Sequence, residues 1–270
     1  MAKPKAPGTT VRQAAARLHE AHQRRERFAP LPPDLAPKTA EEAYAIQDAF
    51  LALRSDKLGP IAGYKIALSS AEMQKFVGVD APQAGAILRS QLQRTPGRVR
   101  AADYMHLIVE FEIAVEIGED LPKADAPFGR ERILQAVAAI MPAIEIADDR
   151  NADYSQLSRH PYELIADNGW NEGAVLDEAV SDWRSLDLGQ VLGVATINGR
   201  KVGEGRGKAA MGHPLEAVAW IANHLASQGR GLLRGEIVIT GSLITSKPVK
   251  AGDRVEFAVG SLGKVDLTVE

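Results

Sequence analysis

Two glutamates stand two residues apart within an apolar run, Ile108–Asp120 (IVEFEIAVEIGED). If this run is a strand, Glu110 and Glu112 project from the same face, because side chains alternate along a strand. Two neighbouring carboxylates repel each other, and a divalent cation such as Mg²⁺, Mn²⁺ or Ca²⁺ removes that repulsion by binding both. The alternative is a solvent-exposed strand face that Glu116 continues, since alternating acids are commonly just exposed.

A third acid, Glu145, stands in a similar apolar segment, Met141–Ile146 (MPAIEI). With Glu110 and Glu112 it makes a set of three carboxylates, which one divalent ion brings to a net charge of −1 (−3 + 2 = −1) and which leaves coordination positions for a chelating substrate. A strand with one outward acid explains Glu145 equally well. The chain has no cysteine, so a metal finds only oxygen or imidazole ligands.

Other ionisable residues are weaker candidates for acid–base catalysis. Lys65 is the one charge in a predicted strand, Ile61–Ile66, and burial of its ammonium is expected to lower its pKa into a useful range, unless it snorkels from a strand end. Asp80 precedes Ala-Pro and is also a plausible turn former. His19 and His22 lie on a predicted surface helix and are expected to face solvent.

Length and composition narrow the function classes. The 270 residues are 45% hydrophobic and 25% charged, and 32 basic against 35 acidic residues give a net charge of −3 without basic blocks. These values are ordinary for a globular enzyme and argue against nucleic acid as a partner. No segment approaches the roughly 18 uninterrupted apolar residues of a membrane span. Met1–Thr10 resembles no targeting segment and is expected to be frayed, so we predict a cytoplasmic enzyme.

The elements that position these residues form an α+β pattern. Two helices are predicted first, Val11–Phe28 and one that starts at Thr39, where Glu42 completes a capping-box pattern. β-rich runs then dominate, interrupted by helices at Arg130–Ile140 and Leu215–Ser227; the runs are Ile61–Ile66, Leu107–Ile117, Ala143–Ile146, Val191–Ile197, Ile237–Thr240, Val255–Val259 and Val265–Val269. Because strands and helices do not alternate regularly, we predict a helical N-terminal part, residues 1–58, and a mixed, rolled or sandwiched β domain, residues 59–270.

Five segments in order resemble the 2-keto-4-pentenoate hydratase family, which includes 4-oxalocrotonate decarboxylases and belongs to the fumarylacetoacetate hydrolase superfamily. They begin with GYKIALSSAEMQKFVGVDAPQAGAIL and cover most of the chain; the five are Gly63–Leu88, Val109–Pro122, Pro142–Arg150, Gly212–Gly229 and Ile239–Asp253. The resemblance implies a mixed β-roll with a small helical N-terminal part, assembled as a homo-oligomer, either a dimer or a ring of dimers.

The same resemblance implies roles for individual residues. Mg²⁺ or Mn²⁺ is expected to bind three acids, Glu110, Glu112 and Glu145. Lys65 and Asp80 correspond to the acid–base groups beside the metal. Ser242, in the Gly-Ser-Leu loop, and Asn171 are expected to bind the substrate.

The activity implied is metal-dependent addition of water to a 2-hydroxy-2,4-dienoate, which gives a 4-hydroxy-2-oxo acid in the meta-cleavage degradation of aromatic hydrocarbons. The same site would serve a 4-oxalocrotonate-type decarboxylase. A carbon–carbon hydrolase of the acylpyruvate or fumarylacetoacetate type is a further alternative, although it usually relies on a His–Glu pair to which only His106 or His213 could contribute. The non-enzyme alternative is an inactive partner subunit.

One loop departs from the family pattern. Relatives usually follow Ala-Asp-Asn with Ala-Ser-Ser-Gly, whereas this chain has Gly-Trp-Asn-Glu at Gly169–Glu172. Either a surface turn is remodelled, or an indole and a new charge alter the substrate pocket. Ile244, where a threonine is common, adds to the second interpretation.

Overall fold

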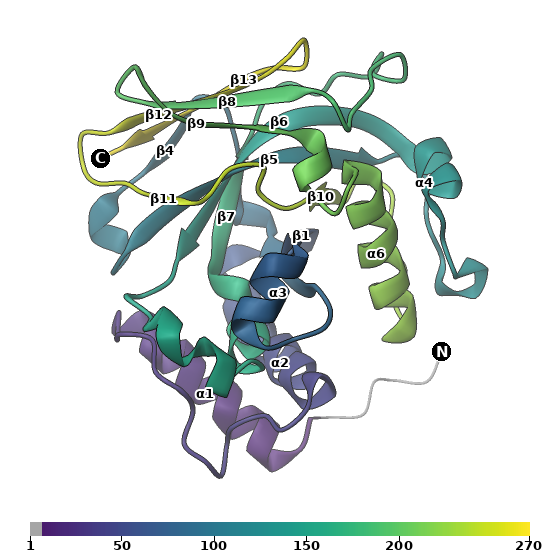
Figure 1. The fold of residues 1–270 in the computed structure, drawn as a ribbon. Helices are drawn as coiled ribbons and strands as arrows, with labels where there is room; N and C mark the ends of the chain where they lie inside the picture. Colours follow the sequence, from purple (N-terminus) through teal and green to yellow (C-terminus); the bar gives the residue numbers. More distant parts are fainter. Residues whose placement is uncertain (1–6) are drawn as a thin grey trace.

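Two mixed β-sheets form the centre of the molecule in the computed structural model, which describes residues 7–270 (Figure 1). The larger sheet has the order β2 (Gln83–Leu88), β1 (Ile61–Ala67), β10 (Ile237–Ile239), β5 (Leu107–Ile117), β6 (Val137–Asp148), β7 (Asn171–Leu176) and β3 (Leu92–Arg94), with β11 (Lys247–Pro248) paired to β5. The smaller sheet has the order β4 (Gly97–Val99), β13 (Gly263–Val269), β12 (Arg254–Val259), β8 (Leu192–Ile197) and β9 (Arg200–Arg206). Among the strands of residues 7–270, three pairings are parallel, β1 with β10, β3 with β7, and β4 with β13.

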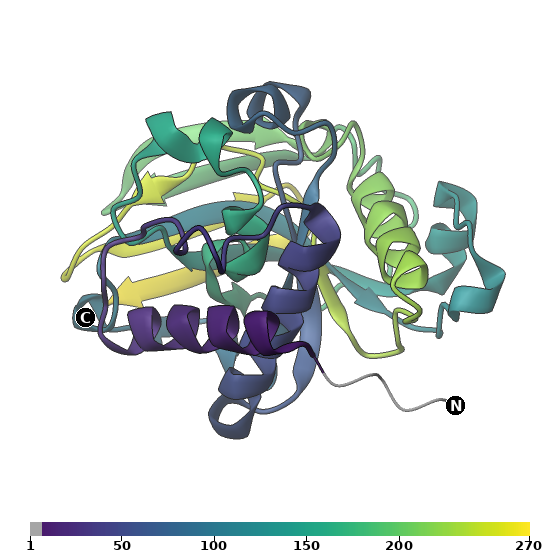
Figure 2. The same ribbon diagram turned by 90° about the horizontal axis from the view of Figure 1, so that it is seen from below.

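Helices cover the larger sheet and its ends. Helices α1 (Thr9–Gln23) and α2 (Ala40–Leu58) lie together beneath it, as Figure 2 shows from below. The others are α3 (Ala71–Val77), α4 (Arg130–Ala136), α5 (Glu163–Ala166) and α6 (Pro214–Ser227), with short 3₁₀ turns η1 (Arg89–Gln91), η2 (Ala101–Asp103), η3 (Lys123–Asp125), η4 (Tyr154–Arg159), η5 (Asn168–Trp170) and η6 (Gly207–Ala209). No helix within residues 7–270 is both long and apolar enough to cross a membrane.

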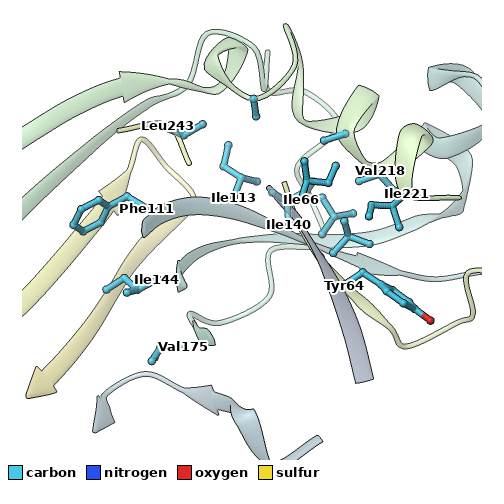
Figure 3. Packing of buried hydrophobic residues seen from close by; sticks show 14 of the residues in the cluster. Tyr64, Ile66, Phe111, Ile113, Ile140, Ile144, Val175, Val218, Ile221 and Leu243 are labelled. Atoms are coloured by element: carbon cyan, nitrogen blue, oxygen red, sulfur yellow. The ribbon is translucent and has the colours of Figure 1, made fainter. Parts of the chain in front are cut away.

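The main core lies between the two sheets, and alternation along β5 builds it. Val109, Phe111 and Ile113 are fully buried in this core, where Figure 3 shows Phe111 and Ile113. The centroid of the Phe111 ring lies 5.4 Å from that of Phe257 in the smaller sheet. Ile144 of β6 contributes to the same cluster. The opposite face of β5 is therefore free to carry the acidic residues of the strand.

The α+β class and the mixed, curled sheets are as predicted, but several elements differ. The predicted helix Arg130–Ile140 is wrong after Ala136, because Val137–Ile140 begins β6 and pairs with β5. Strands β2 and β7 were not predicted, since their alanines and glycines carry little strand preference.

Two expectations concern the N-terminal region. Of the segment expected to be frayed, residues 1–6 lie outside the described part of the chain, whereas Thr9 and Thr10 already belong to α1. Thr39 caps α2 as expected by accepting a hydrogen bond from the Glu42 N–H. The division at residue 58 stays a prediction: α2 ends at Leu58, but Ile165 packs into the same cluster as both helices.

Candidate metal centre and active-site cavity

Three glutamates meet on one face of the β5–β6 ladder. Glu110 lies directly opposite Glu145, while Glu112 lies one same-face position further along β5. One carboxylate oxygen from each lies within 4.8 Å of the others. Glu112 and Glu145 are completely buried, so this face is no solvent-exposed strand face of the kind considered above. The structure therefore brings together the three acids that the sequence singled out.

The oxygens of these acids are only partly satisfied. The Gly241 N–H donates to Glu112 Oε2 at 2.7 Å, but Glu112 Oε1 and Glu145 Oε2 have no hydrogen-bond partner within the described part of the chain. Burial, followed by the charge of Glu145, raises the pKa of Glu110 to about 7 and that of Glu112 well above its usual value. Buried, partnerless carboxylate oxygens fit a hard divalent cation, which supplies the missing positive charge.

Lys65 of β1 completes the group. Its Nζ lies 3.1 Å from Glu145 Oε1 and 3.4 Å from the Gly169 carbonyl oxygen. Burial alone would lower the pKa of Lys65, but the charges of Glu145, Glu110 and Glu112 raise it above its usual value. The expectation of a lowered lysine pKa is therefore wrong for this set of residues, because three acids outweigh the loss of solvation.

A cavity of about 580 Å³ opens from this group, a volume within the range of small-molecule sites. Glu110, Lys65 and Ser242 all line it. The Ser242 hydroxyl accepts from the Phe111 N–H at 2.9 Å and donates to the Ile244 carbonyl at 2.6 Å. Ser242 is thus held at the wall of the cavity, and its contact with a substrate stays a prediction.

Two expected site residues, Asp80 and Asn171, do not line this cavity. Asp80 is exposed and lines a different cavity, of about 690 Å³, together with Tyr44 and Trp220, so the structure does not bring it to Lys65. Asn171 is buried behind the acids, and its Nδ2 donates to Glu145 Oε1 at 2.8 Å. Its side chain orients a candidate metal ligand, a role for which the sequence gave no signal because the contact depends on the β6–β7 pairing.

The departing loop is not a surface turn. Asn168, Gly169 and Trp170 are buried, and all three have left-handed backbone with φ of 55°, 56° and 61°. Asparagine and glycine tolerate this region, whereas it strains a tryptophan, and such strain is concentrated at functional sites. Gly169 and Trp170 line the cavity of Lys65. The interpretation of the loop as an altered pocket wall therefore fits the structure better.

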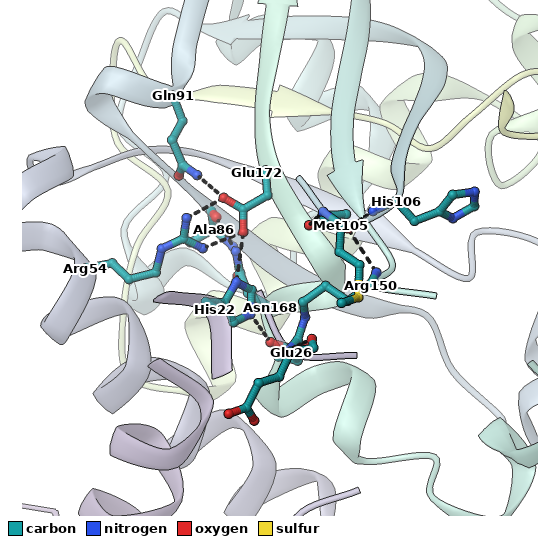
Figure 4. Close-up of polar contacts among 12 residues, drawn as sticks. His22, Glu26, Arg54, Ala86, Gln91, Met105, His106, Arg150, Asn168 and Glu172 are labelled. Carbon is teal, nitrogen blue, oxygen red and sulfur yellow. Dashed lines mark hydrogen bonds and ion pairs between the residues drawn. The ribbon is translucent and has the colours of Figure 1, made fainter. Parts of the chain in front are cut away.

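A buried ionic network holds this loop from below (Figure 4). His22 of α1 places Nε2 2.6 Å from Asp167 Oδ1 and Nδ1 3.1 Å from Glu172 Oε1. Arg54 of α2 pairs with Glu172, and Arg150 pairs with Asp167. Only 12% of the His22 side chain is exposed, so the expectation that it faces solvent is wrong.

The charges of this network make the stability of the protein depend on pH. Burial alone would lower the pKa of His22, but Asp167 and Glu172 raise it above its usual value. Burial alone would raise the pKa of Glu172, but Arg54 and His22 lower it to about 2. A raised histidine pKa stabilises the fold below about pH 6.5 and stops doing so above the folded pKa; a lowered carboxyl pKa stabilises it above about pH 4.3.

Both contributions are therefore complete between about pH 4.5 and 6.5. We expect His22→Gln to lower the free energy of unfolding by about 3 kcal/mol near pH 5.5, as when one partner of a buried ion pair is removed. The deficit should shrink as the pH rises past the folded pKa of His22. Urea denaturation from pH 5 to 9 measures it, with His19→Gln on the same helix as the control. A deficit that is constant over this range would contradict the assignment.

Comparisons with known proteins agree with this geometry. Residues 68–270 match the family described as fumarylacetoacetate (FAA) hydrolase C-terminal. The chain is 32% identical over 249 residues to 2-hydroxyhexa-2,4-dienoate hydratase of Comamonas testosteroni, covering 92% of each chain. It is 32% identical over 253 residues to 2-keto-4-pentenoate hydratase of Paraburkholderia xenovorans (strain LB400), covering 94% of this chain and 92% of the relative.

Among solved structures, 4-oxalocrotonate decarboxylase from Pseudomonas putida G7, complexed with magnesium and adipate, matches with a TM-score of 0.88. The identity is 25%, and the match covers 96% of this chain and 97% of that one. The named hydratase relatives are hydro-lyases, and their similarity extends over nearly the whole chain. The chain therefore belongs to the 2-keto-4-pentenoate hydratase family, within the fumarylacetoacetate hydrolase superfamily.

Proposed function

We propose that the chain is a metal-dependent hydro-lyase that adds water to a 2-hydroxy-2,4-dienoate of the 2-keto-4-pentenoate type and produces a 4-hydroxy-2-oxo acid, as in the meta-cleavage degradation of aromatic compounds. The observation that carries this proposal is the meeting of three carboxylates and Lys65, of which Glu110 and Lys65 line a cavity of about 580 Å³. The hydratase activity of relatives that are 32% identical supports it.

Glu110, Glu112 and Glu145 would hold Mg²⁺ or Mn²⁺. The fit rests on the partnerless oxygens of Glu112 and Glu145 and on the charge sum, because three acids, one ammonium and a divalent ion add to zero (−3 + 1 + 2 = 0). When bound, such an ion stabilises negative charge on the C2 oxygen of a 2-oxo acid. Asn171 and the Gly241 N–H keep two of the carboxylates in place.

Lys65 would move the proton. As an ammonium 3.1 Å from Glu145, it would donate a proton to C5 of the dienoate and take up the proton that the C2 hydroxyl loses, which gives the 2-oxo-3-enoate. Water then adds its oxygen to C4 and a proton to C3. Asp80 would take no part in these steps, because it lines another cavity. Ser242, at the cavity wall, would contact the substrate carboxylate.

Decarboxylation of a 4-oxalocrotonate-type acid is the second candidate, favoured by the TM-score of 0.88 to a decarboxylase. Incubation of the Mg²⁺-loaded protein with 2-hydroxypenta-2,4-dienoate and with 4-oxalocrotonate separates the two. Loss of the ultraviolet absorbance of the dienoate without release of gas supports hydration, and CO₂ from oxalocrotonate supports decarboxylation. Full activity after EDTA treatment would refute a metal-dependent reaction.

The remaining alternatives receive no support from the cavity. Carbon–carbon hydrolysis would need a histidine over the acids, but within the described residues neither His106, bound to Asp149 at 2.7 Å, nor His213, the cap of α6, lines this cavity. An inactive partner subunit need not bind Mn²⁺, so a metal titration tests that possibility. The homo-oligomer, a dimer or a ring of dimers, stays a proposal that sedimentation velocity would test.

A further inference from the structure

The cavity changes from acidic to apolar along the β5–β6 ladder. Glu110 lies opposite Glu145, and the next pair on the same face is Ile108 opposite Ala147. Two residues along a strand span about 6.6–6.8 Å. A five-carbon acid whose head lies at the carboxylates would reach the Ile108–Ala147 pair only with its far end. Anything attached beyond C5 would lie against apolar side chains.

A separate hydrophobic cluster forms this far part of the cavity. It is distinct from the main core between the sheets, and each of its six buried members lines the cavity: Val77, Ile108, Ala147, Leu157, Leu164 and Trp170. Buried apolar side chains that surround a cavity lose water contact favourably when an apolar group fills it. The cluster is therefore suited to a hydrocarbon group.

The charges around the cavity disfavour a second carboxylate on the substrate. Of the described residues that line it, Lys65 is the only cation, and Glu145 already holds it at 3.1 Å. The other charged lining residues, Glu72 and Glu110, are acids. A distal carboxylate would be desolvated without a positive partner, which is costly.

Trp170 of this wall is held in place by its neighbours. Phe28 and Tyr154 pack edge-on against its indole at centroid distances of 5.3 and 5.7 Å. The preceding Asn168 is fixed to the backbone of Ala86 by two hydrogen bonds of 2.8 and 2.9 Å. Glu172, two residues further on, belongs to the ionic network with His22 and Arg54. A wall that is held on both sides is preorganised for one shape of ligand.

We propose that this far part of the cavity is a subsite for an apolar tail, alkyl or aryl, on the distal carbon of the substrate, with Trp170 as a specificity-determining residue. The proposal rests on the hydratase function proposed above and narrows its substrates to monocarboxylic dienoates with a hydrocarbon tail. Dicarboxylic dienoates would therefore not be substrates.

Three saturated 2-oxo acids test the subsite without turnover. 2-Oxopentanoate carries the head alone, whereas 7-methyl-2-oxooctanoate and 2-oxoheptanedioate have the same shape and differ in an isopropyl or a carboxylate end. Calorimetric titration of the Mn²⁺-loaded protein should give a Kd for 7-methyl-2-oxooctanoate about tenfold below that of 2-oxopentanoate, and about a hundredfold below that of 2-oxoheptanedioate.

Variants of the wall locate the effect. Trp170→Ala should remove most of the advantage that the isopropyl tail gives over 2-oxopentanoate, and the milder Trp170→Phe should lie between. Trp220→Phe, at the other cavity, is the matched control and should change none of the three values.

The outcomes separate this proposal from the proposed function. Equal affinity for the two tailed acids, or a preference for the dicarboxylate, overturns the apolar subsite while binding of 2-oxopentanoate keeps the head site. Unchanged tail preference in Trp170→Ala overturns the role of Trp170. If none of the three acids binds in a Mn²⁺-dependent manner, the hydratase function fails and the subsite fails with it.

Discussion

Replacement of Glu112 by Gln is expected to reduce metal-dependent turnover about a thousandfold and to weaken Mn²⁺ binding. Glu112 is completely buried, with one oxygen fixed by the Gly241 N–H and the other without a partner in residues 7–270. The amide of the glutamine keeps the shape of the side chain but removes the negative charge that would bind a cation. A bound ion contributes several kcal/mol to stabilising developing charge, and each 1.36 kcal/mol, roughly, is tenfold in rate.

The same variant should lose turnover but gain stability when no metal is bound. Burial, Glu145 and Glu110 raise the pKa of Glu112. A carboxyl group whose pKa folding raises subtracts from stability at every pH above its unfolded value of about 4.3. The free energy of unfolding of EDTA-treated Glu112→Gln at pH 8 should therefore exceed that of the unaltered protein.

Glu116→Gln is the matched control, because Glu116 lies on the same face of β5 opposite Ala139 and outside the three-acid group. It should leave turnover and Mn²⁺ affinity as they are. Stopped-flow absorbance with the dienoate and a Mn²⁺ titration by electron paramagnetic resonance measure both quantities. Undiminished turnover in Glu112→Gln would remove this acid from the metal site.

Lys65→Met should lower kcat by about a hundredfold to ten-thousandfold, the usual range for loss of a general acid or base. Metal binding should respond differently. The ammonium lies 3.1 Å from a candidate ligand, Glu145, and repels a cation bound there, so its removal should tighten Mn²⁺ binding. Loss of turnover together with tighter binding distinguishes proton transfer from a structural role.

Lys75→Met, on the exposed face of α3, is the control and should change neither value. The measurements are kcat for the dienoate and the Kd of Mn²⁺ by calorimetry. If Lys65→Met loses metal binding as well as turnover, Lys65 maintains the site and another group moves the proton.

The acids and the strand that carries them could be predicted because the relevant signal is local. Side-chain alternation places Glu110 and Glu112 on one face of β5, and the apolar residues between them pack into the main core on the other face. The pairing that sets Glu145 opposite Glu110 is not local and was not predicted, since the family resemblance implied only that the three acids bind one metal. The α+β class could also be predicted, because it follows from the irregular order of β-rich runs and helices along the chain.

Features that depend on contacts between distant segments could not be predicted. The pKa of Lys65 is decided by three acids from other strands, so loss of solvation alone gave the wrong direction. His22 looked exposed because its helix is rich in arginine, yet its partner Asp167 stands 145 residues away. The family resemblance implied that Asp80 lies beside Lys65. In the structure Asp80 lines another cavity.

The ionic network beneath the loop of Trp170 has a consequence for how such a protein diversifies. His22 and Arg54 precede residue 68, where the match to the superfamily begins, yet they hold Glu172 and through it one side of the chamber. Substitutions in α1 or α2 would therefore act on the cavity wall through Glu172. The three candidate metal ligands, Glu110, Glu112 and Glu145, would stay unchanged. We therefore expect substitutions of His22 or Arg54 to change substrate preference while the three acids stay in place.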